Sequence, residues 1–279
     1  MKILIIGKGY MGERLAAAWP DAVVSDAMIT DVESMHRELE KYKPDAVLNA
    51  AGVRGRPNVD WCDEHPLETI RGNTLLPVVI ADACQQAGVY LLHMGSGCIY
   101  YGPSAHTDHA WREDDFGNPL PAYSRSKYAA DLVLSTLPNV GIARIRMPID
   151  WVPNPNNLID KLASFEKVAD VENSVTIIDD MIVAFRQLLE KKAAGIFHVV
   201  NPGTLTFRSL IDMYEELVDP NHHCEFVTDD ALNQAGINKR PRSNNFLNSD
   251  HLVAQDIHLR EVHDALRDTM KKYAAAKRG

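Results

Sequence analysis

The sequence predicts an α/β fold in which a parallel sheet is covered on both faces by helices and is followed by a smaller region. Three observations predict it. Short apolar runs alternate with helical patterns up to about residue 201. The first run, "KILIIG", is continuously apolar, as in a strand buried on both faces. After about Pro148 a Pro- and Asn-rich stretch interrupts the alternation, and the part beyond Asn201 is mainly helical.

The predicted elements alternate along the chain. Strands are predicted for "KILIIG", "AVVSD", "DAVLNAAG", "VYLLHMGS", "GIARIRMP" and "GIFHVVN". Helices are predicted for "GERLAAAW", "DVESMHRELEKY", the stretch from Leu67 to Gln86, "SKYAADLVLSTL" and "DDMIVAFRQLLEKK". Asp31 is the expected N-cap of the second helix, and Gly195 is the expected C-cap of the last one.

Three glycines stand between the first strand and the first helix, in "IIGKGYMG". Gly7, Gly9 and Gly12 allow a tight turn and a close approach of the backbone to a ligand. The N–H groups at the start of the helix would then face a pyrophosphate. This spacing in this context predicts a Rossmann-type dinucleotide site formed by Gly7, Lys8, Gly9, Tyr10, Met11 and Gly12.

The end of the second strand should lie near the adenosine ribose of the dinucleotide. Ser25 there would suit NADPH, whereas Asp26 would suit NADH because a carboxylate accepts a hydrogen bond from the 2′-hydroxyl. Lys8 would meet a 2′-phosphate or lie in solvent, and Asp31 would contact the adenine or only cap its helix. The cofactor is therefore expected to be NADPH or NADH, with a weak preference for NADPH.

The domain organisation follows from the interrupted alternation. We expect residues 1–150 to form the dinucleotide-binding domain, to which the chain returns at about 175–201. Residues 151–174 and 202–279 are expected to form a substrate-binding cap.

A catalytic set is indicated by "PAYSRSKYAAD". Tyr123 and Lys127, four residues apart, lie on one face of a helix. The phenol would give a proton to a ketone oxygen while hydride arrives at the carbon, and the ammonium would lower the pKa of the phenol. Ser96, at the end of a predicted strand, would hydrogen-bond the same oxygen.

Composition excludes several other classes of function. The net charge is −9 and the basic residues form no long run, which disfavours nucleic acid and anionic membranes as partners. No apolar stretch is long enough for a membrane span, and the N-terminus does not read as a signal peptide. Four cysteines without regular spacing indicate neither a disulfide framework nor a metal site, and we expect a cytoplasmic protein.

The chain resembles the extended short-chain dehydrogenase/reductase family, and within it the nucleotide-sugar epimerase/reductases and 4-reductases of rhamnose biosynthesis. The motifs are "NAAGVRGRPNVDWCDEHPLETIRGN", "GSGCIYY", "YSRSK", "RIRMPI", "NPNNLIDKLASFEKV", "NSVTIIDD" and "RPRSNN". They span most of the chain. One departure is the glycine turn, which is one residue shorter than the GxxGxxG usual in that family.

The resemblance implies further cofactor contacts beside Tyr123 and Lys127, from Asn49, Ala50, Ala51, Gly52, Asn73 and Met147. It implies a UDP- or dTDP-linked 4-keto-6-deoxy sugar as substrate and a homodimer formed through two helices per subunit. Arg54, Arg56 and Arg242 would meet the nucleotide diphosphate. The other expected substrate contacts are Pro57, Asn58, Cys98, Asn156 and Asn157.

Cys98 decides between two forms of the activity. A 4-keto group acidifies the hydrogens on C3 and C5, so their inversion needs a base and a proton donor. If the strand stays extended, Ser96 and Cys98 point the same way. The resemblance places Cys98 on the cysteine tied to epimerisation and Lys161 on its lysine partner. The alternative for Cys98 is a small buried hydrophobic side chain, and the alternative for Lys161 is a position on a solvated helix face.

Three functions therefore stand. The first is a 3,5-epimerase/4-reductase that makes a nucleotide-linked L-rhamnose. The second is a simple 4-reductase of the dTDP-4-dehydrorhamnose type. The third is a catalytically silent NADP-binding regulatory subunit, against which the intact Ser96, Tyr123 and Lys127 argue.

Overall fold

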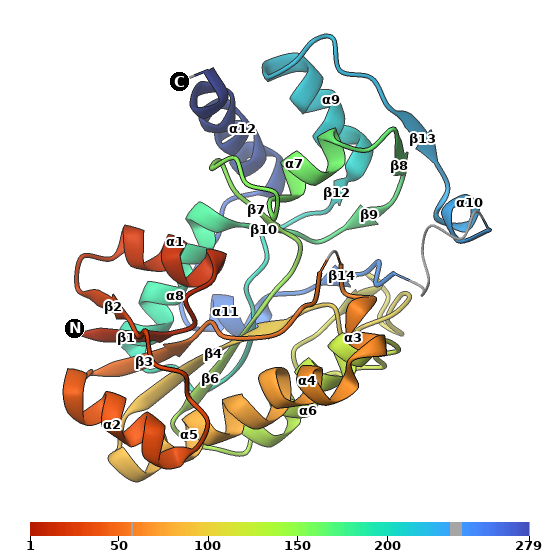
Figure 1. Ribbon diagram of the computed structural model, residues 1–279. Coiled ribbons are helices and arrows are strands. Elements are labelled where there is room, and N and C mark those ends of the chain that lie inside the picture. The colour runs from red at the N-terminus through yellow and green to blue at the C-terminus, as the bar shows by residue number, and fades with distance from the viewer. Residues whose placement is uncertain (57, 235–241, 279) are drawn as a thin grey trace. The chain divides into compact units, whose positions relative to one another are not determined.

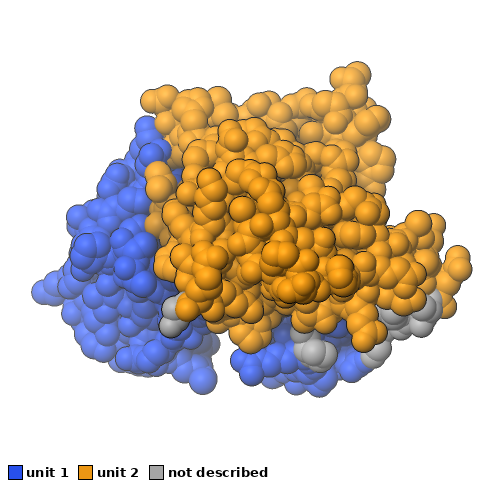
Figure 2. All heavy atoms as spheres, turned by 90° about the horizontal axis from the view of Figure 1, so that it is seen from above, with its two compact units in different colours: residues 1–99, 116–144, 184–197 blue, residues 100–115, 145–183, 198–279 orange. Residues whose placement is uncertain are grey.

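The computed structural model describes residues 1–56, 58–234 and 242–278. Its two compact units, coloured separately in Figure 2, are formed by residues 1–99, 116–144 and 184–197 and by residues 100–115, 145–183 and 198–279. The first unit holds β1 (Ile3–Ile6), α1 (Tyr10–Ala18), β2 (Ala22–Val24), α2 (Val32–Tyr42), β3 (Ala46–Asn49), α3 (Trp61–Glu64), α4 (Pro66–Ile70), the π-helix η1 (Arg71–Leu75), α5 (Leu76–Ala87), β4 (Tyr90–Ser96), α6 (Ala122–Leu134), β6 (Val140–Ile145) and β11 (Gly195–His198).

The second unit carries short strands and most of the later helices. They are β5 (Ala110–Trp111), β7 (Pro148–Ile149), α7 (Leu158–Ala163), β8 (Lys167–Ala169), β9 (Glu172–Asn173), β10 (Thr176–Ile177), β12 (Leu205–Thr206), α9 (Phe207–Leu217), β13 (Glu225–Val227), α10 (Asp229–Gln234), β14 (Phe246–Leu247), α11 (Asp250–Ala254) and α12 (Val262–Arg278). Helix α8 (Ile178–Lys191) begins in this unit and ends in the first.

A six-stranded sheet in the order β11-β6-β4-β3-β1-β2 organises the first unit (Figure 1). The strands β2, β1, β3 and β4 pair in parallel, and the register places Ile6 beside Asn49 and Asn49 beside His93. Every residue of β1, β3 and β4 is buried, as expected for strands covered on both faces. Helices α2, α5 and α6 lie on one face of the sheet and α1 on the other (Figure 1). The predicted fold class is confirmed.

Several element predictions can be compared with the structure directly. Asp31 caps α2 as predicted, because its side chain accepts the Ser34 N–H at 2.7 Å. The predicted long helix is present but is interrupted by η1. The Gly195 cap is wrong: α8 ends at Lys191, Lys192 takes the left-handed conformation with φ 47°, and two backbone bonds close the end in a Schellman pattern. Gly195 instead begins β11.

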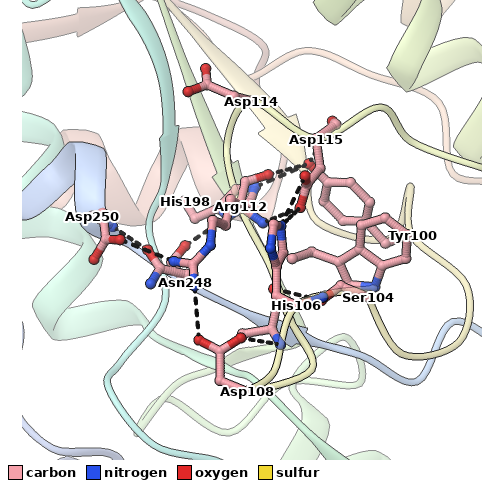
Figure 3. A network of polar contacts seen from close by, with 12 residues as sticks. Tyr100, Ser104, His106, Asp108, Arg112, Asp114, Asp115, His198, Asn248 and Asp250 are labelled. Atoms are coloured by element: carbon pink, nitrogen blue, oxygen red, sulfur yellow. Dashed lines mark hydrogen bonds and ion pairs between the residues drawn. The ribbon is translucent and has the colours of Figure 1, made fainter.

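Residues 100–115 belong to the second unit, whereas the sequence placed the whole of 1–150 in the first. Strand β5 in this segment pairs with β14. Figure 3 shows the polar contacts of residues 100–115. Arg112 bonds Asp250 at 3.2 Å and Asp108 at 3.1 Å, and His106 bonds Asp115 at 3.0 Å. The contacts with residues far along the chain could not be read from local sequence patterns.

Each unit has a hydrophobic core of its own. In the first, Leu4, Val47 and Leu91 from the sheet pack with Met35 and Ile80 from the helices. The core of the second joins side chains of α7, α9 and α12 with those of the short strands, among them Ile159, Leu210, Leu266, Met270 and Tyr273. Among the described residues no helix combines the length and hydropathy needed to cross a bilayer.

Candidate active site

The glycine turn packs tightly against the loop that follows β3. Gly7 has φ +114°, and a Cβ there would lie 2.5 Å from the backbone nitrogen of Ala51. A Cβ on Gly12 would lie 2.0 Å from the carbonyl oxygen of Gly7. At Gly9, the N-cap of α1, a Cβ would meet nothing within 4 Å, and no side chain caps the helix. This open cradle at a helix N-terminus fits a dinucleotide pyrophosphate.

The ribose end of the predicted cofactor site differs from expectation at Ser25. Its hydroxyl donates to Glu38 Oε2 at 2.5 Å and accepts from Ala27 N–H at 3.0 Å, and the residue is 3% exposed. Ser25 is therefore not placed to meet a 2′-phosphate. Beyond it, Asp26 and Lys8 form an exposed ion pair of 2.5 Å. The Asp31 carboxylate is engaged at the start of α2.

Ser96 and Tyr123 meet at the carboxyl end of β4. Ser96 is the last residue of β4, Tyr123 lies in the first turn of α6, and their side chains are hydrogen-bonded. Loss of solvation, reinforced by the nearby Cys98, raises the pKa of Tyr123, and the bond to Ser96 opposes this only in part. The net shift of the phenol pKa is therefore upward, opposite to the lowering expected from the sequence, because burial dominates.

Lys127 lies one turn along α6 and is 5% exposed. Its Nζ donates to the Met94 carbonyl oxygen at 2.7 Å and lies 3.4 Å from His93 Nε2. Burial lowers the pKa of Lys127 to about 8, although Asp131 acts in the opposite direction. Near neutral pH, Lys127 therefore populates both the ammonium and the neutral amine.

The π-helix η1 fixes α6 to the loop after β3. Asn73 accepts the N–H of Val53 at 2.7 Å and donates to its carbonyl oxygen at 2.7 Å. It also donates to Ser126 Oγ at 3.1 Å, between the two catalytic candidates of α6. Thr74 donates to the Ser126 carbonyl oxygen at 2.8 Å. Asn73 therefore holds the Val53 backbone and the Ser126 side chain, and its expected contact with the cofactor remains a prediction. A π-helix is a frequent feature of functional sites.

Cys98 lies next to Ser96 because the backbone turns after β4, a conformation that the sequence did not predict. The strand ends at Ser96 and the chain turns over residues 97–99, so the assumed extended backbone is wrong. The Cys98 N–H donates to Ser96 Oγ at 3.2 Å. Through this bond Cys98 stays next to Ser96 in space, and its charge, when present, would raise the pKa of Tyr123. All four cysteines are thiols.

The loop after β3 carries the other predicted substrate residues of the first unit. Arg54 and Arg56 are exposed, and the charge of Arg54 reaches Tyr123 and lowers its pKa slightly. The Asn58 side-chain oxygen accepts the Asp60 N–H at 2.8 Å and so shapes the turn. Pro57 lies outside the described residues. Ala50, Ala51 and Gly52 line the turn against Gly7 and Asn73.

The remaining predicted residues belong to the second unit. Asn157 is fully buried, caps α7 and binds the backbone of Asp150, so it is structural rather than substrate-facing. Lys161 is half-buried on α7, and Asn156 is exposed. Arg242 lies near Asp229 and lowers its pKa against the larger effect of burial. Met147 has a strained φ of 40° and packs against the core.

Sequence reasoning missed two residues that support α6. Asp63 accepts the N–H of Ala122 at 2.9 Å and so caps the helix from α3. His93 is fully buried beneath Lys127 and bonds Asn49 at 3.0 Å. The signal for His93 was a polar residue within the apolar run "VYLLHMGS", because a buried polar group needs a partner. Asn49, expected at the cofactor, is likewise fully buried.

Comparison with known proteins places the chain in a family. Residues 1–275 match the RmlD substrate binding domain. The chain is 34% identical to the bifunctional dTDP-4-dehydrorhamnose 3,5-epimerase/dTDP-4-dehydrorhamnose reductase of Arabidopsis thaliana, over 94% of this chain and 90% of the relative. A trifunctional UDP-glucose 4,6-dehydratase/UDP-4-keto-6-deoxy-D-glucose 3,5-epimerase/UDP-4-keto-L-rhamnose-reductase of the same plant is 30% identical over 95% of this chain, which spans 41% of that protein.

A solved structure agrees with these relatives. The L780 UDP-rhamnose synthase of Acanthamoeba polyphaga mimivirus superposes with a TM-score of 0.89 at 27% identity, covering 97% of this chain and 99% of the other. The chain therefore belongs to the RmlD substrate binding domain family. The predicted family and the prediction of an enzyme are both confirmed.

Proposed function

We propose that this enzyme reduces the 4-keto group of a UDP- or dTDP-linked 4-keto-6-deoxy sugar with NADPH or NADH, after inverting C3 and C5 of the same sugar. The observation that carries the proposal is the gathering of Ser96, Tyr123 and Lys127 with Cys98 at the end of β4. The names of the plant and viral relatives, which include both dTDP- and UDP-linked activities, support the substrate class.

The glycine cradle and the N-terminus of α1 would hold the pyrophosphate of the cofactor, which supplies hydride when bound. Tyr123 would then donate its proton to the 4-keto oxygen. Its raised pKa suits this direction, because the phenol stays protonated until the oxygen gains negative charge. Ser96, already bonded to the phenol, would hold that oxygen in line. The ammonium of Lys127 would stabilise the phenolate that remains.

The epimerase step is proposed for Cys98. The 4-keto group makes the hydrogens on C3 and C5 acidic, and the bond of the Cys98 N–H to Ser96 Oγ would keep the thiol within reach of a sugar whose ketone is bound at Ser96 and Tyr123. Lys161 is its expected partner from the resemblance, and this role remains a prediction. The homodimer and the cytoplasmic location also remain predictions.

A spectroscopic assay of reduced nicotinamide tests the reductase. UDP- and dTDP-4-keto-6-deoxyglucose would be offered in turn with NADPH and with NADH. Tyr123→Phe should lower kcat by at least about 100-fold, because it removes the proton donor while keeping the ring. Full activity in this variant would reject the proposed role of Tyr123. Bound cofactor with no turnover on any 4-keto sugar would favour the regulatory subunit instead.

A further inference from the structure

A line of buried polar contacts runs from the loop after β3 to Lys127. The Ala51 N–H donates to Asn49 Oδ1 at 3.0 Å. Asn49 Nδ2 lies 3.0 Å from His93 Nδ1, and His93 Nε2 lies 3.4 Å from Lys127 Nζ. Asn49 and His93 have no exposed surface. No step of the proposed reaction uses His93, so its place in this line needs an explanation.

The contacts determine which nitrogen of His93 carries the proton. Because the Asn49 oxygen is held by the Ala51 N–H, the amide nitrogen faces the ring and donates to Nδ1. A nitrogen that accepts a hydrogen bond carries no proton. The proton of the neutral imidazole is therefore on Nε2, the nitrogen that faces Lys127.

An Nε2–H group discriminates between the two forms of Lys127. The neutral amine has a lone pair that accepts from Nε2–H while one of its own N–H groups donates to the Met94 carbonyl oxygen. An ammonium has only donors, so its N–H groups would face the Nε2–H of His93 and the two could form no hydrogen bond. Burial and the neighbouring Lys127 also hold the pKa of His93 well below its usual value, so the ring stays neutral.

The titratable and charged groups around Lys127 come from α6, β6 and β4. Asp131, one turn further along α6, favours the ammonium and is itself paired with Arg144 of β6 at 2.8 Å. Tyr123 lies one turn back on the same helix. His93 lies on β4, where an Nε2–H that faces Nζ would favour the amine, against the effect of Asp131.

We propose that His93, with its tautomer fixed by Asn49, is a positioning residue that stabilises the neutral amine of Lys127. This deepens the proposed function and rests on it. When the phenolate of Tyr123 recovers its proton, an N–H bond of the Lys127 ammonium breaks, an O–H bond forms, and an amine is left. His93 Nε2–H then donates to that amine until water returns a proton.

The pH dependence of kcat/KM tests the proposal. A glutamine at position 93 can accept a hydrogen bond from the Lys127 ammonium through its side-chain oxygen. The Nε2–H of His93 can only donate, so it cannot stabilise the ammonium in this way. His93→Gln should therefore move the alkaline limb upward from about pH 8 by roughly half to one unit. Asn49→Ala, which releases the tautomer, should move it in the same direction. An unchanged limb in both variants would overturn the proposal.

His198→Gln is the matched control. His198 is also fully buried, but its Nδ1 lies 2.7 Å from the Asn248 carbonyl oxygen and it takes no part in the contacts of Lys127. This variant should leave the alkaline limb where it is in the wild type. An equal shift in this control would mean that any buried histidine produces the effect, and would also overturn the proposal.

A second measurement needs neither substrate nor turnover, so it separates this proposal from the proposed function. Nitrogen NMR of the protein labelled with ¹⁵N in its histidines distinguishes the tautomers, and the His93→Gln spectrum identifies the signals of His93. The expected result is an unprotonated Nδ1 and a protonated Nε2, unchanged as the pH falls to about 5. A proton on Nδ1 would overturn the proposal even if the enzyme reduces 4-keto sugars.

Discussion

Arg144 Nε lies 2.8 Å from Asp131 Oδ2, and both side chains are almost completely withdrawn from solvent. Asp131 extends from the same helix as Lys127 and Arg144 from strand β6. Burial raises the pKa of Asp131, and the guanidinium counteracts this rise. The pair therefore places a compensated charge one helical turn beyond Lys127 on α6.

Replacing one member of this pair should be costly. Arg144→Met leaves the Asp131 carboxylate buried without its cation, which should reduce the free energy of unfolding by about 3–5 kcal/mol. Urea denaturation followed by circular dichroism measures this. The double variant Asp131→Leu with Arg144→Met should recover most of the loss. A single variant as stable as the wild type would show that the pair contributes nothing.

Burial of the charged Lys127 should reduce the free energy of unfolding. Its pKa is 10.5 in an unfolded chain and about 8 here, so below pH 8 the folded state carries the full penalty. That penalty fades as the pH rises from 8 to 10.5. Lys127→Met should be inactive and more stable at pH 7, on the order of 1–3 kcal/mol.

Urea denaturation of the same two proteins at pH 10 tests the direction of the Lys127 pKa shift. The stability gap between Lys127→Met and the wild type should shrink there, because the folded-state lysine is already neutral and the lysine of the unfolded chain lies close to its own pKa of 10.5, so losing its proton costs little. A gap that widens between pH 7 and pH 10 would contradict the lowered pKa.

The Lys8–Asp26 pair should control the choice of cofactor. Asp26 neutralises Lys8 and would repel a 2′-phosphate. Asp26→Asn should raise the NADPH-to-NADH ratio of kcat/KM by about tenfold, equivalent to roughly 1.4 kcal/mol. Lys8→Gln is the companion variant and should lower that ratio. An identical ratio in all three proteins would place cofactor selection elsewhere.

The glycine turn, Tyr123, Lys127 and Ser96 could be predicted because each depends on local spacing. Gly7 to Gly12 follow a strand and open a helix, and Tyr123 and Lys127 are one helical turn apart. Asp31 was identified as a cap for the same reason, since an N-cap acts on residues two or three positions away.

Partners far apart in the sequence could not be predicted. Ser25 is engaged by Glu38, Asn73 binds Val53 and Ser126, and His93 joins Asn49 to Lys127. Each pairing exists only once the strands have taken their order, and no local pattern encodes it. The turn at residues 97–99 was missed because glycine permits both an extended and a turned backbone.

The central claim is that one site both epimerises and reduces, with Cys98 needed only for the first step. The most direct measurement is solvent deuterium uptake at C3 and C5 of a nucleotide-linked 4-keto-6-deoxyglucose, followed by NMR before NADPH is added. The wild type should exchange both positions. Cys98→Ala should exchange neither, yet should still reduce a sugar that has already been epimerised. Exchange at the wild-type rate in Cys98→Ala would contradict the claim.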